Sequence, residues 1–288
     1  MSTLTHAAPG AGPRHAPNGK DLTFARILRS EWIKFTTLSS TYVLLACTVA
    51  VIVGIALIST WSFGWVLEQA AADPQMAGAV ESDPDFATLG ATLLSGGISF
   101  AQLIIGSLAV MMMSSEFATG TARATFTAAP RRLNVLGAKA LIAAVTAFAT
   151  TVVAMLAAYV AVQPLADRYG IEFDPAGEAF QRQLWIGAAF VVAIALIGLA
   201  LGTLLRNSAG AIVTLAGLVF VLPMILMAFS ADLIVTIRQY LPDAAYGNLI
   251  ASESFPDAPE QWVSALVLAA WAIVPLVVSA LVLRRRDV

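Results

Sequence analysis

The sequence has few charged residues and almost no cysteine or histidine. Only 12% of its 288 residues are charged, whereas a soluble domain of this length carries about a quarter. The single cysteine, Cys47, excludes an internal disulfide and a metal site built from several cysteines. Both histidines, His6 and His15, lie in a stretch rich in Ala, Pro and Gly. We expect residues 1–20 to form a disordered tail and residues 21–288 to form one membrane domain.

Apolar residues fill the rest of the chain, at 59% of the total and a mean hydropathy of +0.82. They form six runs of about the 20 residues that cross a bilayer. Only helices satisfy every backbone group there without a partner strand. Pro223 and Pro275 lie inside the last two runs and predict kinks. The sequence predicts an all-α, polytopic membrane protein with helices at 41–63, 91–113, 135–162, 184–205, 210–229 and 262–283.

The basic residues divide unevenly between the connecting segments. With the N-terminus inside, 13 of the 16 Lys and Arg residues lie inside, and Arg168, Arg182 and Arg238 lie outside. The positive-inside rule then places both termini in the cytoplasm, with the chain in the plasma membrane.

Residues 22–38 predict an amphipathic helix ahead of the first span. Apolar residues share one face and basic residues the opposite side, as expected for a helix in the inner headgroup layer. A soluble helix packed on another cytoplasmic element is the alternative. The apolar face holds Phe24, Ala25, Leu28, Trp32 and Phe35, and the polar side holds Arg26, Arg29, Ser30 and Lys34.

Residues 230–261 are too apolar for a solvated outer loop and are broken by Pro242 and Gly247. We expect two short helices here. They either dip into the outer leaflet, packed against protein, or cap the bundle from outside.

Several chemistries lack the residues they need. No span has an ionisable residue near its middle, which disfavours an ion-coupled carrier. None of the three lysines follows the Gly-x-x-x-x-Gly of a phosphate-binding loop, so any work driven by ATP needs a partner.

The cytoplasmic stretch 114–132 has the features of a docking element. Thr121–Ala128 predicts a two-turn helix that ends before Pro130, and Gly120 permits a sharp turn before it. Phe126 could fill a groove in a partner. Glu116 could stabilise the N-terminus of this short helix or pair with a nearby arginine. An ordinary inner loop would explain only the basic residues, Arg123, Arg131 and Arg132.

The stretch SEFATGTARATFTAAPRRLNVLGAKAL resembles the cytoplasmic segment of ABC transporter permeases of the type-2 exporter class. That class shows Glu-x-x-x-Gly-Thr, a short coupling helix, Pro-x-Arg and a later Lys. The matching residues here are Glu116, Gly120, Thr121, Pro130, Arg132 and Lys139. The stretches LRSEWIKFTTLSSTYVLL, LGTLLRNSAGAIVTLAGLVFVLPMIL and YLPDAAYGNLI resemble further segments of small six-span permeases.

The resemblance implies a half-transporter that exports its substrate with energy from two separate ABC ATPase subunits. ATP and magnesium would be bound by those subunits, with no cofactor, metal or nucleic acid in this chain. A second permease copy or a paralogue would complete a dimer in the bilayer. The substrate would be an amphipathic drug, peptide or lipid; candidate path residues are Ser99, Gln102, Ser107, Phe220, Met224 and Met227.

Two rivals stay open: a non-transporting scaffold or immunity-type protein, and, with less support, an ion-coupled carrier. The pattern Gly198-x-x-x-Gly202 indicates close helix packing, within the chain in preference to between chains.

Overall fold

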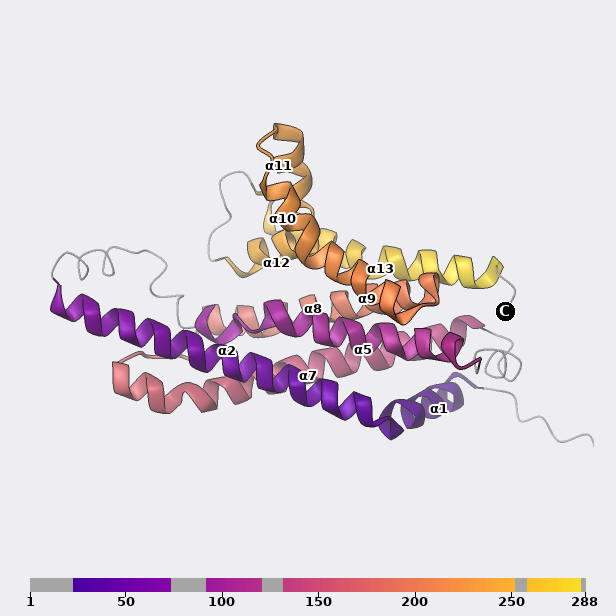
Figure 1. The fold of residues 1–288 in the computed structure, drawn as a ribbon, viewed down its shortest axis with the longest axis horizontal. Helices are drawn as coiled ribbons and strands as arrows, with labels where there is room; N and C mark the ends of the chain where they lie inside the picture. The colour runs from indigo at the N-terminus through magenta and orange to yellow at the C-terminus, as the bar shows by residue number, and fades with distance from the viewer. Residues whose placement is uncertain (1–22, 74–91, 121–131, 252–257, 286–288) are drawn as a thin grey trace, which may run out of the picture.

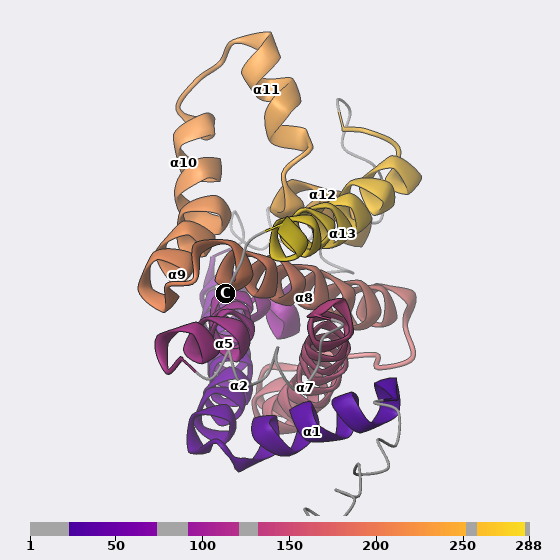
Figure 2. The same cartoon turned by 90° about the vertical axis from the view of Figure 1, so that its right-hand side faces the viewer.

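The protein is a bundle of long helices with one short helix lying across its end (Figures 1 and 2). A computed structural model describes residues 23–73, 92–120, 132–251 and 258–285, and this part of the chain has no strand. Its elements are α1 (Phe24–Thr37), α2 (Ser39–Ala72), α5 (Ile98–Ala118), α7 (Arg132–Tyr169), α8 (Glu178–Leu205), α9 (Ser208–Ala216), the π-helix η1 (Gly217–Val221), α10 (Leu222–Met227), α11 (Asp232–Gln239), α12 (Pro242–Ile250) and α13 (Gln261–Arg285).

Six helical segments are long and apolar enough to cross a membrane, which confirms the predicted all-α, six-span architecture. The fifth consists of α9, η1 and α10 in succession. Two spans exceed their predicted ranges the most: α2 has 34 residues and α7 has 38. At 1.5 Å per residue, α2 is about 51 Å long and exceeds the ~30 Å hydrocarbon layer. An apolar run marks the part of a helix that lies in lipid and not the ends of the helix.

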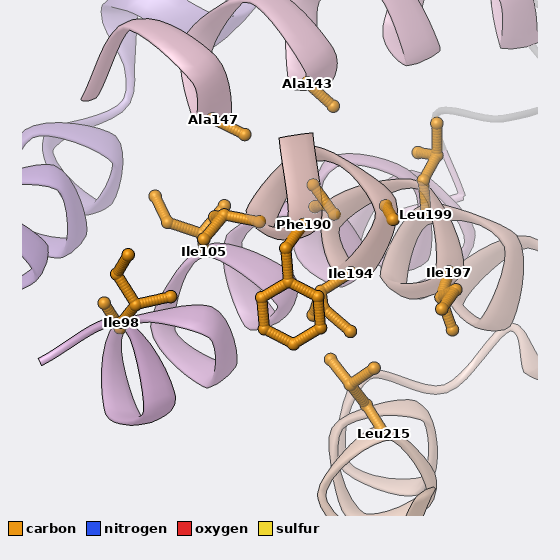
Figure 3. Packing of buried hydrophobic residues seen from close by; sticks show 14 of the residues in the cluster. Ile98, Ile105, Ala143, Ala147, Phe190, Ile194, Ile197, Leu199 and Leu215 are labelled. Atoms are coloured by element: carbon orange, nitrogen blue, oxygen red, sulfur yellow. The ribbon is translucent and has the colours of Figure 1, made fainter. Parts of the chain in front are cut away.

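Helices α5 and α8 form the centre of the bundle, and most residues of their apolar windows are buried. In Figure 3 the Phe190 ring of α8 lies among side chains from the helices around it: Ile98 and Ile105 of α5, Ala143 and Ala147 of α7, and Leu215 of α9. Phe190 is fully buried and stacks on Tyr246 of α12, with ring centroids 4.4 Å apart.

Glycines bring α5 and α8 into backbone contact. A Cβ atom built on Gly198 would lie 2.4 Å from the carbonyl oxygen of Gly106, and one on Gly202 would lie 2.5 Å from that of Val110. The Gly-x-x-x-Gly pattern therefore packs helices within the chain, as predicted.

The fifth span is interrupted where the sequence places Pro223. Proline has no N–H to donate, and the π-helix η1 ends two residues before Pro223. Pro275, in contrast, lies inside the single helix α13.

The segment after the fifth span forms two short helices, α11 and α12, as predicted. Helices α10 and α11 project from the bundle in Figures 1 and 2. Whether this segment enters the membrane stays a prediction.

The close approach of α5 and α8 predicts that Gly198→Ala lowers stability, because its methyl group meets a backbone carbonyl that cannot rotate away. Overpacking of this kind costs about 1–3 kcal/mol. The thermal unfolding midpoint of the purified protein in detergent measures it. Gly54→Ala in α2 is the matched control, since a Cβ there meets nothing within 4 Å. Equal midpoints for both variants would contradict this packing.

Candidate functional site: a buried ion cluster beside α1

The α1 end of the bundle holds α1, the last turn of α5 and the first turns of α7, and it is on the right in Figure 1. The predicted docking segment connects α5 to α7 at this end. Glu116 and Gly120 belong to its described part, and Arg132 is the first residue of α7. The other predicted coupling residues lie outside the described residues: Thr121, Arg123, Phe126, Pro130 and Arg131.

Four charged side chains from three helices meet here, and we call them the ion cluster: Glu31 and Lys34 of α1, Glu116 of α5 and Lys139 of α7. The Lys139 ammonium lies 2.6 Å from Glu31 Oε2 and 2.9 Å from Glu116 Oε1. The Lys34 ammonium lies 2.7 Å from Glu31 Oε1 and 3.0 Å from Glu116 Oε1. Two carboxylates thus alternate with two ammonium groups, and the cluster has no net charge.

Lys139 has no unused hydrogen-bond donor. Its side chain is only 4% exposed, and it donates to Glu116 and to the Met112 carbonyl at 2.9 Å besides its ion pair with Glu31. An ammonium has three N–H donors, and these three acceptors account for all of them. Lys34 differs, because its side chain is 42% exposed and two acceptors contact its ammonium.

Both α1 members of the ion cluster, Glu31 and Lys34, stay ionised near neutral pH. Burial by itself raises the pKa of Glu31, but the ion pairs with Lys139 and Lys34 outweigh burial and hold that pKa below the ordinary 4.5. Burial likewise lowers the pKa of Lys34, but its bonds to Glu31 and Glu116 raise it above the ordinary 10.5. The contribution of Glu31 to stability is therefore complete above pH 4.5 and is lost as the pH falls through its folded-state pKa. The contribution of Lys34 is lost only as the pH rises through a value above 10.5.

Helix α1 packs against the protein with only part of its predicted apolar face, and whether the rest lies in the headgroup layer stays a prediction. Ile27, Glu31 and Phe35 are buried, whereas Trp32 is exposed. Lys34, expected on the polar side with Arg26 and Arg29, joins the ion cluster. A helical wheel scores Glu31 as polar, so it cannot anticipate that two lysines neutralise this acid inside the protein.

A second set of contacts ties α5 to the turn between α8 and α9. Ser114 Oγ and Ser208 Oγ share a hydrogen bond of 2.8 Å, and the Arg206 guanidinium lies 4.8 Å from the centre of the Phe117 ring. Arg206 has a φ of 52°, and Asn207 caps α9 by accepting a hydrogen bond from the Gly210 N–H. The end of α5 is therefore held from two sides. The sequence did not predict the Ser114–Ser208 and Phe117–Arg206 contacts, because each contact joins two residues that are about 90 positions apart in the chain.

Gly120 has a φ of +70°, in the left-handed region that branched side chains strongly disfavour. The chain turns here directly after α5, and a Cβ would meet no atom within 4 Å. Backbone geometry, and not space, therefore makes glycine suitable at this position.

The candidate path residues occupy different environments. Ser99 on α5 and Phe220, Met224 and Met227 on the fifth span are exposed, and Ser107 is half-buried. Gln102 is 1% exposed and lies inside the bundle, where its amide donates to the Ser99 carbonyl at 2.9 Å.

The ion cluster is suited to holding helices together. Each carboxylate is already paired with ammonium groups, and no three His, Cys, Asp or Glu residues of the described ranges could hold a metal ion together. Burying four charges adds little net stability, but removing one of them leaves an unpaired charge in the interior.

The cluster predicts a double-mutant result. Lys139→Met leaves two buried carboxylates facing a single ammonium and should cost about 3–5 kcal/mol. Adding Glu31→Gln restores one acid and one base, Glu116 and Lys34, and should recover part of that loss. Thermal unfolding midpoints of the single and double variants in one detergent measure the coupling.

Arg168→Gln is the control for this cycle, because the Arg168–Glu68 pair spans 3.8 Å and both side chains are more than half exposed. Exposed pairs of this kind contribute about 0–1 kcal/mol. If Lys139→Met is no more costly than Arg168→Gln, or if Glu31→Gln adds to the loss, the cluster does not behave as a coupled unit.

Comparison with known proteins places this geometry in a family. A search of curated proteins found no match. The family described as "ABC-2 family transporter protein" matches residues 75–281, which include Glu116, Gly120 and Lys139 and leave out α1. The match covers most of the chain, and the six apolar helices fit a membrane transport component. The chain therefore belongs to the ABC-2 family of transporter membrane proteins, and it is an ABC transporter permease.

Proposed function

We propose that this permease exports an amphipathic substrate (a drug, a peptide or a lipid) with energy from two separate ABC ATPase subunits. The observation that carries the proposal is the ion cluster, which joins α1, α5 and α7 directly beside the predicted docking segment. ATP and magnesium would be bound by the ATPase subunits, so hydrolysis belongs to the partner.

Force applied to the docking segment would reach α1, α5, α7 and the fifth span together. Glu116 lies one turn before Gly120, and its carboxylate contacts lysines of α1 and α7. On the other side of α5, Ser114 contacts the start of α9 in the fifth span. A push on this segment would therefore move the end of α5, with α1 and α7 on one side and the fifth span on the other.

The substrate path would lie between two copies of the permease, or between this chain and a paralogue. The exposed apolar surface of η1 and α10 supports this position, since α10 has no buried residue. Ser99, Phe220, Met224 and Met227 would face the path, and Ser107 would lie at its edge. Gln102 would act from inside the bundle, by fixing the backbone at Ser99.

The proposed orientation has both termini and the α1 end in the cytoplasm of a bacterial cell. The 13-to-3 division of basic residues supports it. A non-transporting scaffold or immunity-type protein is the second candidate, and the same docking segment would then bind a partner without coupling to transport.

The proposal predicts that Phe126→Glu weakens ATPase binding, because a two-turn helix offers a small patch in which one aromatic side chain can dominate. Full burial of such a ring contributes roughly 1.5–3 kcal/mol. Gly120→Val should uncouple the segment through its backbone, whereas Gly120→Asn should be tolerated better at φ +70°. Co-purification of the ATPase and substrate-stimulated hydrolysis in reconstituted membranes measure both effects.

Phe126→Leu is the matched control and should retain most of the binding, because it keeps an apolar side chain. Phe117→Leu is not a neutral control, because the Arg206 guanidinium lies over that ring. Full partner binding with coupled transport in Phe126→Glu membranes would contradict the docking role. Partner binding without any coupled transport in the unaltered protein would favour the scaffold.

A further inference from the structure

A cavity of about 340 Å³ lies against the ion cluster, between α1, the first turn of α2 and the last turns of α5. Its charged end consists of Glu31, Lys34, Glu116 and Lys139. Its apolar wall consists of Phe35, Leu38, Leu108, Met111 and Met112. The lining thus combines charged groups with a largely apolar wall, as expected of a site for an amphipathic molecule.

The charged end offers a hydrogen-bond donor to a ligand, and both of its carboxylate groups are paired with ammonium groups. Lys139 uses all three of its N–H groups within the protein. Lys34 contacts two acceptors, Glu31 and Glu116, so its third N–H is left for a ligand in the cavity that it lines. An anion can bind this third N–H group without displacing Lys34 from either carboxylate.

The start of α2 adds further donors to the same cavity. The N-cap residue of α2 is Leu38, whose side chain cannot accept the first N–H groups of the helix. The hydroxyls of Ser40 and Thr41 line the cavity and make no hydrogen bond to the described residues. The lining of the cavity thus combines an ammonium, hydroxyl-bearing residues and the positive end of a 34-residue helix.

The position of the cavity limits which anion can reach it. Its border includes the exposed Leu38 and the half-buried Lys34, Ser40 and Met111, where α1 meets the first membrane span. A volume of this size takes a headgroup with the upper part of one acyl chain and not a whole lipid. Lipid headgroups lie at this level of a bilayer, and acidic ones concentrate in the cytoplasmic leaflet.

We propose that the cavity binds an anionic phospholipid from the leaflet in which α1 lies. The phosphate contacts the third N–H of Lys34 and the hydroxyls of Ser40 and Thr41. One acyl chain lies along Leu38, Leu108 and Met111. The lipid contacts α1, α2 and α5 on the side of the ion cluster where Lys34 is partly exposed. Its binding requires neither the ATPase nor transport.

Native mass spectrometry of the full chain tests the site, with phosphatidylglycerol and phosphatidylcholine of identical acyl chains offered in equal amounts. The unaltered protein should retain one phosphatidylglycerol in preference to phosphatidylcholine. Lys34→Gln should weaken that retention roughly tenfold, because a charge-assisted hydrogen bond is lost. Lys34→Arg should keep it. Met111→Trp fills the cavity without altering any charge and should abolish retention.

Arg29→Gln is the matched control, since it removes the same charge from an exposed position of the same helix. It should leave retention unchanged. The proposal would be overturned if Lys34→Gln and Met111→Trp both retained phosphatidylglycerol as well as the unaltered protein does. It would also be overturned if Arg29→Gln lost as much retention as Lys34→Gln. Displacement of phosphatidylglycerol by inorganic phosphate alone would also overturn the proposal, because it would show that the site binds a free anion. If Lys34→Gln lowers the unfolding midpoint, the Met111→Trp result decides.

Discussion

The requirement that no charge be left alone inside the protein governs the α1 end of this molecule. Glu31, Glu116 and Lys139 are all buried, and each is stable there only because the others are present. Their contacts fix the rotation of α1 about its axis and the height of α5 against α7. The neutral cluster contributes little to net stability, and its main effect is to favour one arrangement of α1, α5 and α7 over others. Sliding any of the three helices would separate a carboxylate from its ammonium.

The ion cluster connects residues 75–281, which match the family, to α1, which lies outside the match. Glu116 and Lys139 fall within the matched residues 75–281, whereas Glu31 and Lys34 precede them. Helix α1 is therefore held by residues of the family segment, next to the segment proposed to receive the ATPase. The glycine contacts between α5 and α8 carry the same rigidity through the bundle, because backbones in direct contact cannot shift independently.

Local patterns sufficed to predict the helices, and pairings between distant residues did not follow from them. Long apolar runs located all six spans, and Pro223 located the break in the fifth. The resemblance singled out Glu116 and Lys139, but nothing along the chain indicated that Lys34 and Glu31 would meet them. Glu31 stands 85 positions before Glu116, and its burial depends on a neutralising partner that only the folded chain supplies. The cavity beside Lys34 could not be predicted either, because it forms where three helices fail to fill the space between them.

The central claim is that the ion cluster fixes α1 on the bundle. Pulsed electron paramagnetic resonance on chains labelled at Ile33→Cys and Leu141→Cys, in a Cys47→Ala background, tests it in liposomes. Both positions are exposed and lie on α1 and α7. The account predicts one narrow distance distribution, which broadens when Lys139→Met is added and stays narrow with Arg168→Gln. A distribution that Lys139→Met leaves unchanged would contradict it, because α1 would then be held by its apolar contacts alone.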